Sequence, residues 1–480
     1  MVLKARICEL PDDILAFTLS FLPIREASRT SLLSCRWRHL WKDSMKFSSS
    51  LILDELSMTG STYTNKGFCK EGSPLETEQC KFIGWVDQML QMGYGPVIDS
   101  FRLRFTMTKD FAHHIDKWIK VAITKRAQRY DIDLSGFHTI RYVFDFPYEN
   151  LYTFPDWLFT QESGPSVVSL HLKSCALGCL GFNCFSSLAD LQLHSVFLDQ
   201  DSLVKFLSDC PNIEKLALVN CWKLHRLSIS GPSLKLKKMK IVKCRTLSYI
   251  EINARNLTRL EHCGGKVQFS FVDARALSNF VICARSEGQD DNDDFAINYA
   301  VTKLSSDLPQ LQMLFLDGPA PQENMIPRQL PMFKNLKKLG MHVSGFREES
   351  LWGFIHLLHA SPCLHMLELH LSTPDEYIKQ KRPLDVAHLH LKEIVVSGFQ
   401  GDSHEIELMR YLLSNCVALK KVTLDECNKI YDYIHSAMSS MKQYRRYTDK
   451  FKLAETKKLV QEQIVPFVPH GVEFLYIDGL

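Results

Sequence analysis

The sequence predicts an α/β fold in which a small N-terminal helical unit precedes a long array of repeats with a parallel sheet. Three observations lead to this prediction. The first forty-five residues have the apolar periodicity of three short helices. Apolar-x-apolar-x-x-Cys fragments then recur along the chain. Near the C-terminus, a strand pattern, a glycine-containing turn, a helix pattern and another strand pattern come one after another.

The N-terminal helical unit has more apolar surface than so small a unit can bury. Its first helix should begin near Pro11, because proline and acidic residues favour the first turn, and it should end before Pro23. The apolar residues of this helix fall on two faces, with Ile14, Phe17 and Phe21 on one and Leu15, Leu19 and Leu22 on the other. A short helix that is apolar on two faces suggests that one face belongs to a partner.

The motifs in this unit have a specific order. They are Leu10-Pro11-Asp12-Asp13, Phe21-Leu22-Pro23, Arg25-Glu26-Ala27 and Arg36-Trp37-Arg38. In this order they resemble the plant F-box, which we place at residues 5–45. An unrelated three-helix cap on a larger core is the alternative.

The F-box resemblance implies docking to the Skp-type adaptor of a cullin ubiquitin ligase. It carries over ten candidate adaptor-binding residues, namely Leu10, Pro11, Ile14, Leu15, Leu19, Leu22, Pro23, Leu32, Leu33 and Trp37. Leu10, Pro11 and Leu15 are the first choices among them. Some of the ten must instead fill the core of the three helices, and the sequence does not divide the two groups.

Length and composition restrict the rest of the chain. It has 480 residues, so a large domain or repeat array must come after the helical unit. Its net charge of +3 is small for this length and argues neither for nor against nucleic acid. No broad basic footprint appears, and we expect no nucleic-acid partner. Fifteen cysteines without a secretion signal indicate a reducing compartment, the nucleus and/or the cytoplasm. No run of eighteen apolar residues occurs, so we expect no membrane span.

Four fragments share the apolar-x-apolar-x-x-Cys pattern. They begin at Leu170, Leu216, Met239 and Val422, and the cysteine comes five residues later in each. The alternation predicts a short strand with one buried face, after which the cysteine turns inward. This pattern is similar to that of leucine-rich repeats. We place an irregular solenoid of such repeats at residues 98–384, after a linker and first cap elements at 46–97.

The spacing of the apolar fragments predicts two kinds of repeat. Leu216, Leu227, Met239 and Ile250 begin strands only eleven or twelve residues apart, which leaves no room for a helix. We therefore expect two strands per turn of the solenoid there, or tight turns in place of helices. Helical periodicity appears instead at 111–126, 200–208 and 349–360, and these helices should cover the convex side of the array.

The C-terminal region resembles a second known unit. Residues 391–401, 405–416 and 419–424 read as strand, helix and strand, with Gly398 and Gly401 in the first turn. This order is similar to the FBD domain that follows leucine-rich repeats in many plant F-box proteins. We place it at 385–430 and expect a helix with a basic face and a final strand within 431–480.

Catalytic, metal and cofactor motifs do not emerge from the sequence. There is no phosphate-binding glycine loop, and His404-Glu405 lacks the second histidine of a zinc protease helix. Cys175, Cys179 and Cys184 lack the paired Cys-x-x-Cys spacing of structural zinc sites. We therefore predict no catalytic residue, no metal and no cofactor. The acidic stretch 286–294 is expected to be a solvated loop, with contact to a basic substrate as the alternative.

The resemblances together predict a non-catalytic substrate-recognition subunit of a Skp-cullin-F-box ubiquitin ligase. The F-box would hold the adaptor, and the repeats would hold a target protein whose identity the sequence does not reveal. Interface residues tend to be large or charged, so His171, His194 and Lys215 are candidates for target contact. One alternative is a repeat scaffold that acts outside a ligase. Another is an enzyme with a site hidden in the repeats.

Overall fold

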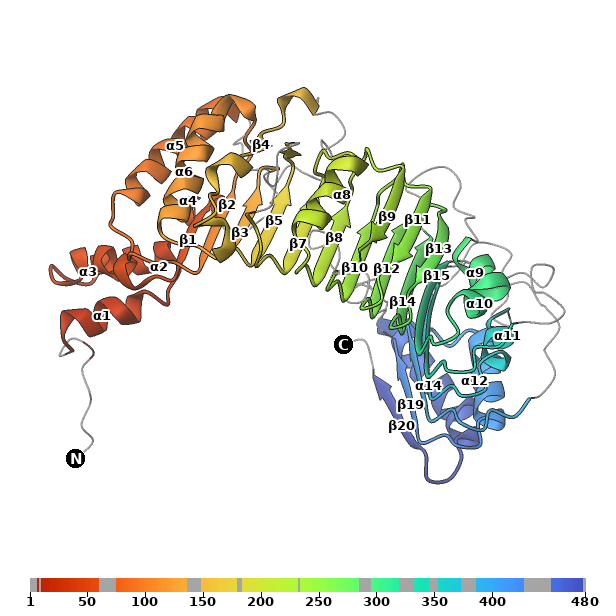
Figure 1. The fold of residues 1–480 in the computed structure, drawn as a ribbon. Coiled ribbons are helices and arrows are strands. Elements are labelled where there is room, and N and C mark those ends of the chain that lie inside the picture. Colours follow the sequence, from red (N-terminus) through yellow and green to blue (C-terminus); the bar gives the residue numbers. More distant parts are fainter. Residues whose placement is uncertain are drawn as a thin grey trace, which may run out of the picture. The chain divides into compact units, whose positions relative to one another are not determined.

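The computed structural model describes residues 7, 10–59, 75–135, 148–178, 184–231, 234–284, 295–318, 331–344, 353–372, 386–426 and 450–477. The chain divides into two compact units. The first contains residues 1–225 and 233–236, and the second contains 226–232 and 237–480. Both are built mainly from parallel strands (Figure 1).

The first unit begins with the helical unit and continues as a parallel sheet. The helices are α1 (Asp12–Leu19), α2 (Ile24–Arg29) and α3 (Trp37–Ser44), with the 3-10 turn η2 (Thr30–Leu32) before α3. The strands then pair side by side in chain order as β1 (Ser50–Asp54), β2 (Ser100–Arg104), β3 (Arg129–Asp133), β5 (Ser169–Lys173), β7 (Asp190–His194) and β8 (Lys215–Val219). The short strands β4 (Thr153–Phe154) and β6 (Ala176–Leu177) pair separately.

The second unit has a larger parallel sheet and a small second one. The large sheet contains β10 (Lys238–Val242), β12 (Arg259–Gly264), β14 (Asn279–Ala284), β15 (Met313–Gly318), β16 (Lys338–Ser344), β17 (Met366–Ser372), β18 (Glu393–Ser397), β19 (Lys421–Asp425) and β20 (Glu473–Ile477). The small sheet contains β9 (Arg226–Ser230), β11 (Tyr249–Asn253) and β13 (Gln268–Asp273). Strands of the two sheets alternate along the chain from β9 to β14. The predicted two strands per turn are therefore confirmed, as is the final strand.

Outside the coils that contain β9, β11 and β13, helices cover one face of the parallel sheet in each unit, as expected for repeats that replace the second strand by a helix (Figure 1). In the first unit these are α4 (Glu55–Thr59), α5 (Leu75–Leu90), α6 (Ala112–Thr124) and α8 (Gln200–Asp209). In the second unit they are α9 (Phe295–Tyr299), α10 (Ser305–Asp307), α11 (Gly353–His359) and α12 (Ser403–Asn415). The predicted helices at 111–126 and 200–208 are confirmed, and the described part of 349–360 is helical.

The repeat cysteines turn inward for a backbone reason. Cys175, Cys221 and Cys244 are buried. The residues just before them, Ser174, Asn220 and Lys243, have φ angles of 56°, 54° and 55°. This left-handed conformation reverses the chain at the end of the strand, so that the next side chain enters the core. The inward turn is thus confirmed for these three repeats, whereas Cys427 lies outside the described residues.

The array starts earlier in the chain than the sequence predicts. Residues 46–97, predicted as a linker and first cap elements, contain β1, whose Leu51 and Leu53 are fully buried, and the sixteen-residue helix α5. The sequence from about residue 57 onward is polar and was read as a linker, so the short apolar strand just before it was not recognised. The compact division near residues 225–237 also falls inside the predicted solenoid.

Other expectations lie wholly or partly outside the described residues. Of the predicted C-terminal helix, the structure describes α14 (Lys450–Gln463). Lys457 and Lys458 on it are exposed, while Lys442, Arg445 and Arg446 lie outside the described residues. The acidic stretch 286–294 and Cys179 lie outside them as well.

Candidate functional site

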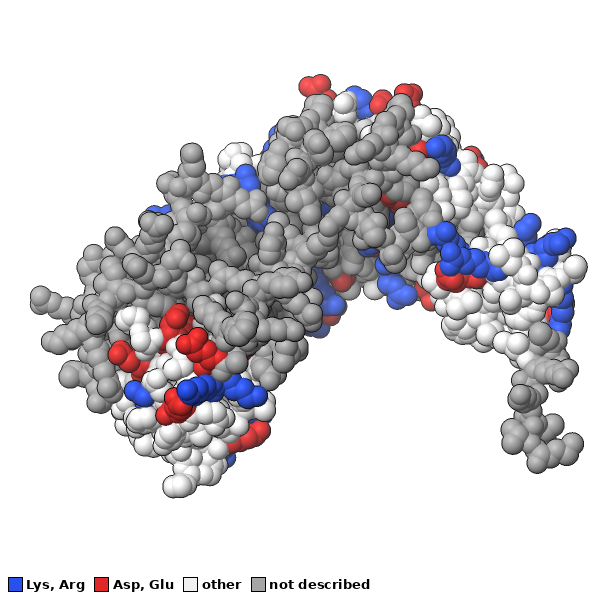
Figure 2. Space-filling model, turned by 180° about the vertical axis from the view of Figure 1, so that it is seen from behind, with Lys and Arg blue, Asp and Glu red and all other residues white. Residues whose placement is uncertain are grey.

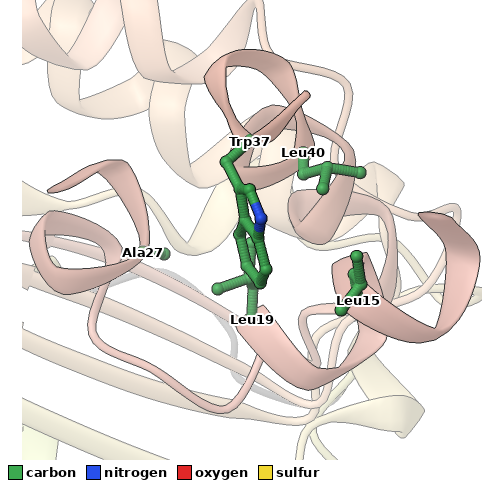
Figure 3. Packing of buried hydrophobic residues seen from close by; sticks show 5 residues of the cluster. All are labelled: Leu15, Leu19, Ala27, Trp37 and Leu40. Atoms are coloured by element: carbon green, nitrogen blue, oxygen red, sulfur yellow. The ribbon is translucent and has the colours of Figure 1, made fainter. Parts of the chain in front are cut away.

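The three N-terminal helices pack around a small apolar core. Its buried members are Leu15 and Leu19 from α1, Ala27 from α2, and Trp37 and Leu40 from α3. Their side chains converge on one centre, with the indole of Trp37 in the middle (Figure 3). Three of the ten candidate adaptor contacts therefore lie in this core, as was expected for some of them. Leu15, Leu19 and Trp37 are at most 6% exposed, so they support the surface from inside instead of forming it.

The other seven candidates are exposed. Leu32 and Leu33 are 87% and 68% exposed, and Leu10, Ile14 and Leu22 are more than two-fifths exposed. Pro11 and Pro23 lie on the surface too. Among the described residues, eight of the twenty-one strongly exposed large apolar side chains lie between Ile7 and Leu33. Such a concentration on so short a segment is typical of a surface that binds another molecule.

Two exposed phenylalanines extend this apolar surface and were not among the ten candidates. Phe17 follows Ile14 by one helical turn, and its ring lies edge-on to Phe21 with 5.0 Å between centroids. It also meets Phe47 edge-on at 5.9 Å. The signal was present in the sequence, because Ile14, Phe17 and Phe21 form one stripe. The ten candidates were chosen from the resemblance, and neither phenylalanine was among them, although Phe21 stands in one of its motifs.

Arg36 fixes the entry to α1, where the first-choice residues Leu10 and Pro11 lie. Its Nε donates a hydrogen bond to Asp12 Oδ1 at 2.7 Å, and its Nη2 donates to the carbonyl oxygen of Leu10. An ion pair this exposed adds little to folding stability. Its effect is geometric, because it ties the start of α1 to the start of α3 and holds Leu10 and Pro11 in one orientation.

The strand face of the first unit carries a network of paired charges. Arg102 and Arg104 on β2 donate to the same carboxylate oxygen of Asp131 on β3, at 2.9 and 2.8 Å. Lys173 on β5 donates to Asp133 at 3.1 Å. The strand face of the first unit therefore presents paired charges of both signs. Figure 2 shows the molecule from behind, where red and blue side chains also lie in small mixed groups on the described surface.

Two of the candidate target contacts meet around one carboxylate in this unit. His171 Nε2 lies 3.6 Å from one oxygen of Asp190, and Lys215 Nζ lies 4.0 Å from the other. Burial raises the pKa of Asp190, but the neighbouring His171 and Lys215 outweigh burial and hold this pKa below its ordinary value. His194 lies at the C-terminal end of β7, two strand positions beyond Gln192, and is half-buried.

The strand face of the second unit holds the arrangement that bears most on the enzyme alternative. Ser397 Oγ lies 2.5 Å from His370 Nδ1, and His370 Nε2 lies 3.2 Å from Glu368 Oε1. A hydroxyl, an imidazole and a carboxylate in this order are the groups of a serine nucleophile site. The adjacent pair His342 and Asp317 is joined at 2.6 Å.

Burial and charge pairing give the Ser397 group a structural role. Ser397 and His370 are 1% and 3% exposed, so a substrate does not reach the hydroxyl. Lys338 Nζ binds Glu368 at 2.6 Å. Burial raises the pKa of Glu368, but His370 and Lys338 together lower it to about 2. The carboxylate is thus committed to two partners, His370 on its own strand β17 and Lys338 on the neighbouring strand β16. Among the described residues, no three His, Cys, Asp or Glu side chains form a metal site either.

The C-terminal strand, helix and strand are present as β18, α12 and β19. The turn between β18 and α12 has Gly398 and Gly401 at φ angles of 74° and 79°, which explains both glycines. Glu405 Oε2 accepts hydrogen bonds from the backbone N–H groups of Gln400, Gly401 and Asp402. One buried carboxylate thus holds the whole turn.

The helix α14 docks on this turn. Thr456 Oγ1 donates to the carbonyl oxygen of Gln400 at 3.0 Å, and Arg410 Nε of α12 donates to that of Gln463 at 2.9 Å.

No helix among the described residues is long and apolar enough to cross a bilayer.

A helical unit with an exposed apolar stripe, joined to strand-and-turn repeats, defines an F-box protein with leucine-rich repeats. The F-box domain matches residues 7–49. The family described as At1g61320/AtMIF1, LRR domain, matches residues 90–478, and the chain belongs to this family. F-box domains generally bind Skp-type adaptors, and proteins that combine the two domains are typically non-catalytic adaptors.

Several Arabidopsis thaliana proteins are similar along most of their length. F-box/LRR-repeat protein At5g54820 is 24% identical, with 95% of this chain and 97% of that protein covered. F-box/LRR-repeat protein At3g58930 is 25% identical, with 87% and 89% covered. F-box/FBD/LRR-repeat protein At5g56810 is 26% identical, with the same coverage. The last name agrees with the FBD-like order of β18, α12 and β19.

Proposed function

We propose that the chain is the substrate-recognition subunit of a Skp-cullin-F-box ubiquitin ligase. The observation that carries this proposal is the apolar surface of the F-box, where the side chains of Leu32 and Leu33 are largely exposed to solvent. Burying such side chains on a partner releases about 1.5–3 kcal/mol each. An Skp-type adaptor is the partner that the family indicates.

The chemistry of ubiquitin transfer would belong to other subunits. A target held on the repeats and an adaptor held on the F-box would share one scaffold, which raises the effective concentration of the target near the charged conjugating enzyme. The strand faces supply the polar surface for the target, including the His171, Asp190 and Lys215 group. This division of work requires no nucleophile in the chain.

The adaptor contact is tested by titrating the full-length chain with a purified Skp-type adaptor in a calorimeter. Leu33→Ala should weaken binding about tenfold, which is about 1.4 kcal/mol, because it removes an exposed anchor. Val417→Ala is the matched control, since Val417 is also 68% exposed but lies in the second unit. If Leu33→Ala and Leu32→Ala both bind the adaptor as tightly as the wild type does, the apolar F-box surface is not the adaptor contact.

Membership of a ligase is a separate question from adaptor binding. Affinity capture of the tagged chain should recover a cullin together with the adaptor, and the Leu33→Ala variant should lose both. Capture of the adaptor without a cullin favours the scaffold that acts outside a ligase.

We also propose that the protein works in the nucleus and/or the cytoplasm. The described cysteines are free thiols, eight of them buried in the described structure, as a reducing compartment permits. Imaging of a fluorescent fusion tests this. A secretory location would contradict the ligase proposal as well.

A further inference from the structure

Positive charge is concentrated in one part of the second unit. Residues 237–284 contain nine Lys and Arg but three Asp and Glu, a net charge of +6, whereas the entire chain carries +3. The remainder of the protein is therefore slightly acidic. In this segment each coil of the solenoid contains two strands. The connections between the strands are short, so charged residues of successive coils return to the same edge of the sheet.

Four of these residues lie in the first positions of β10 and β12 or in the turn that leads into β12. We call Lys238, Lys240, Arg255 and Arg259 the basic edge. Lys238 and Arg259 are partners in the parallel register of β10 and β12. The backbone N–H groups of Thr258 and Arg259 donate to the carbonyl oxygen of Lys237, which holds the two strand starts together. Arg255 lies in the turn that leads into β12.

The basic edge carries more positive than negative charge. Glu261 is shared, because its carboxylate lies 2.6 Å from Arg259 and 3.5 Å from Lys240. Lys238 and Arg255 are exposed. One carboxylate shared between two of the four cations leaves a local excess of positive charge that an anionic partner would neutralise.

The neighbouring coil shows a balanced charge at the same position. Arg275 follows β13 as Arg255 follows β11, and Arg275 Nε donates to Asp273 at 3.0 Å. The register partner of Asp273 in β11 is Asn253, which carries no charge. The turn of Arg275 is therefore neutral, whereas the turn of Arg255 keeps its positive charge.

We propose that the basic edge binds an acidic segment of the target protein, an inference that rests on the proposed function. A peptide is favoured over nucleic acid for two reasons. Glu261 sits inside the edge and would repel an evenly charged phosphate backbone, while separated carboxylates can avoid it. In addition, no aromatic residue occupies the strand positions 238, 240, 259, 261 and 279, which reach solvent here, so bases find no stacking platform on them.

The test is fluorescence anisotropy with the full-length chain bound to its adaptor. The probes are a short peptide of alternating Glu and Ser, the same peptide with Gln for Glu, and a single-stranded oligothymidine of equal length. The Glu peptide should bind more tightly than the other two, with an affinity that falls as salt rises. Lys238→Gln/Arg255→Gln should weaken it about tenfold.

The matched control removes a whole ion pair one coil away. Asp273→Asn/Arg275→Gln leaves the net charge unchanged and should bind the Glu peptide like the wild type.

The proposal would be overturned if both double variants lost the same affinity for the Glu peptide. It would also be overturned if the Glu peptide showed no salt-sensitive binding. Tighter binding of oligothymidine would overturn it too and assign the edge to nucleic acid. Adaptor affinity of every variant is measured alongside. Intact adaptor binding with no peptide binding defeats this inference alone, and absent adaptor binding in the wild type defeats the proposed function.

Discussion

Leu15 and Leu33 carry the same side chain in opposite surroundings, one fully buried and the other 68% exposed. The same truncation should therefore act on different properties. Leu15→Ala should destabilise the F-box by about 2–5 kcal/mol, because it leaves a cavity beside Trp37. Leu33→Ala should change stability by less than about 0.5 kcal/mol. Hydrogen exchange of the peptides that cover α1 to α3 measures both, and unchanged exchange in Leu15→Ala would contradict the core assignment.

The division of the ten candidates could not be read from the sequence. Leu10, Pro11 and Leu15 belong to the same motif, and the helical period shows only that Leu15 and Leu19 share a face. Which face is buried depends on the position of Trp37 and Leu40, which a different helix supplies. Within α1 the period separated the buried Leu15 and Leu19 from the exposed Ile14 and Phe17, but it grouped the exposed Leu22, which lies beyond α1, with the buried pair. Only tertiary packing shows which face is buried.

At the scale of the element, the turn before α12 depends on one buried carboxylate. Burial raises the pKa of Glu405 to about 7, although the backbone N–H groups it binds act against this. An acid whose pKa is higher in the folded state than in the unfolded state favours folding most when it is protonated. Its contribution is full below about pH 4.5 and falls as pH rises through about 7.

Variants of Glu405 separate its charge from its hydrogen bonds. Glu405→Gln keeps an oxygen acceptor, so it should cost less than Glu405→Ala, which leaves three backbone N–H groups without this acceptor and should cost about 2–3 kcal/mol. The stability of the wild type relative to Glu405→Gln should decrease as pH rises through about 7. Urea unfolding of the three proteins over that pH range measures this, and a difference that grows with pH would contradict the sign.

Local spacing predicted elements well wherever the pattern repeated. The eleven- and twelve-residue steps from Leu216 to Ile250 became alternating strands of two sheets. The helix α6, where helical periodicity was found at 111–126, buries Ile115, Trp118, Ile119 and Ala122 at the spacing of one helix face. In contrast, β1 was missed. Its central residues Leu51, Ile52 and Leu53 form a continuous apolar run before a polar stretch, so neither the period of two nor a repeat spacing marked them.

At the scale of the whole molecule, average charge was misleading. The entire chain carries a net charge of only +3, yet residues 237–284 carry +6. Composition averages over the chain, whereas a solenoid returns residues about twenty apart to adjacent positions. The coil that brings Lys238 beside Arg259 is therefore what turns scattered cations into a basic edge. The register of the strands, which the sequence did not provide, was needed to find it.

The proposed arrangement predicts that adaptor binding protects one cysteine and spares two others. Cys35 follows Leu32 and Leu33 and is exposed, while Cys80 and Cys363 are exposed elsewhere in the chain. Maleimide labelling of Cys35, followed by mass spectrometry, should slow when the Skp-type adaptor is added. Cys80 and Cys363 should label at unchanged rates, which makes them internal controls.

Buried repeat cysteines calibrate the same experiment. Burial raises the pKa of the Cys175 thiol to about 12, so it should stay unlabelled while the array is folded. Labelling of Cys175 would show that the chain had opened, and such a sample would not report on the adaptor. With Cys175 protected, an unchanged rate at Cys35 would mean that the adaptor does not cover the surface around Leu32 and Leu33. Slowing at all three exposed cysteines would mean that the adaptor contacts the repeats as well, and the separation of adaptor and target surfaces would fail.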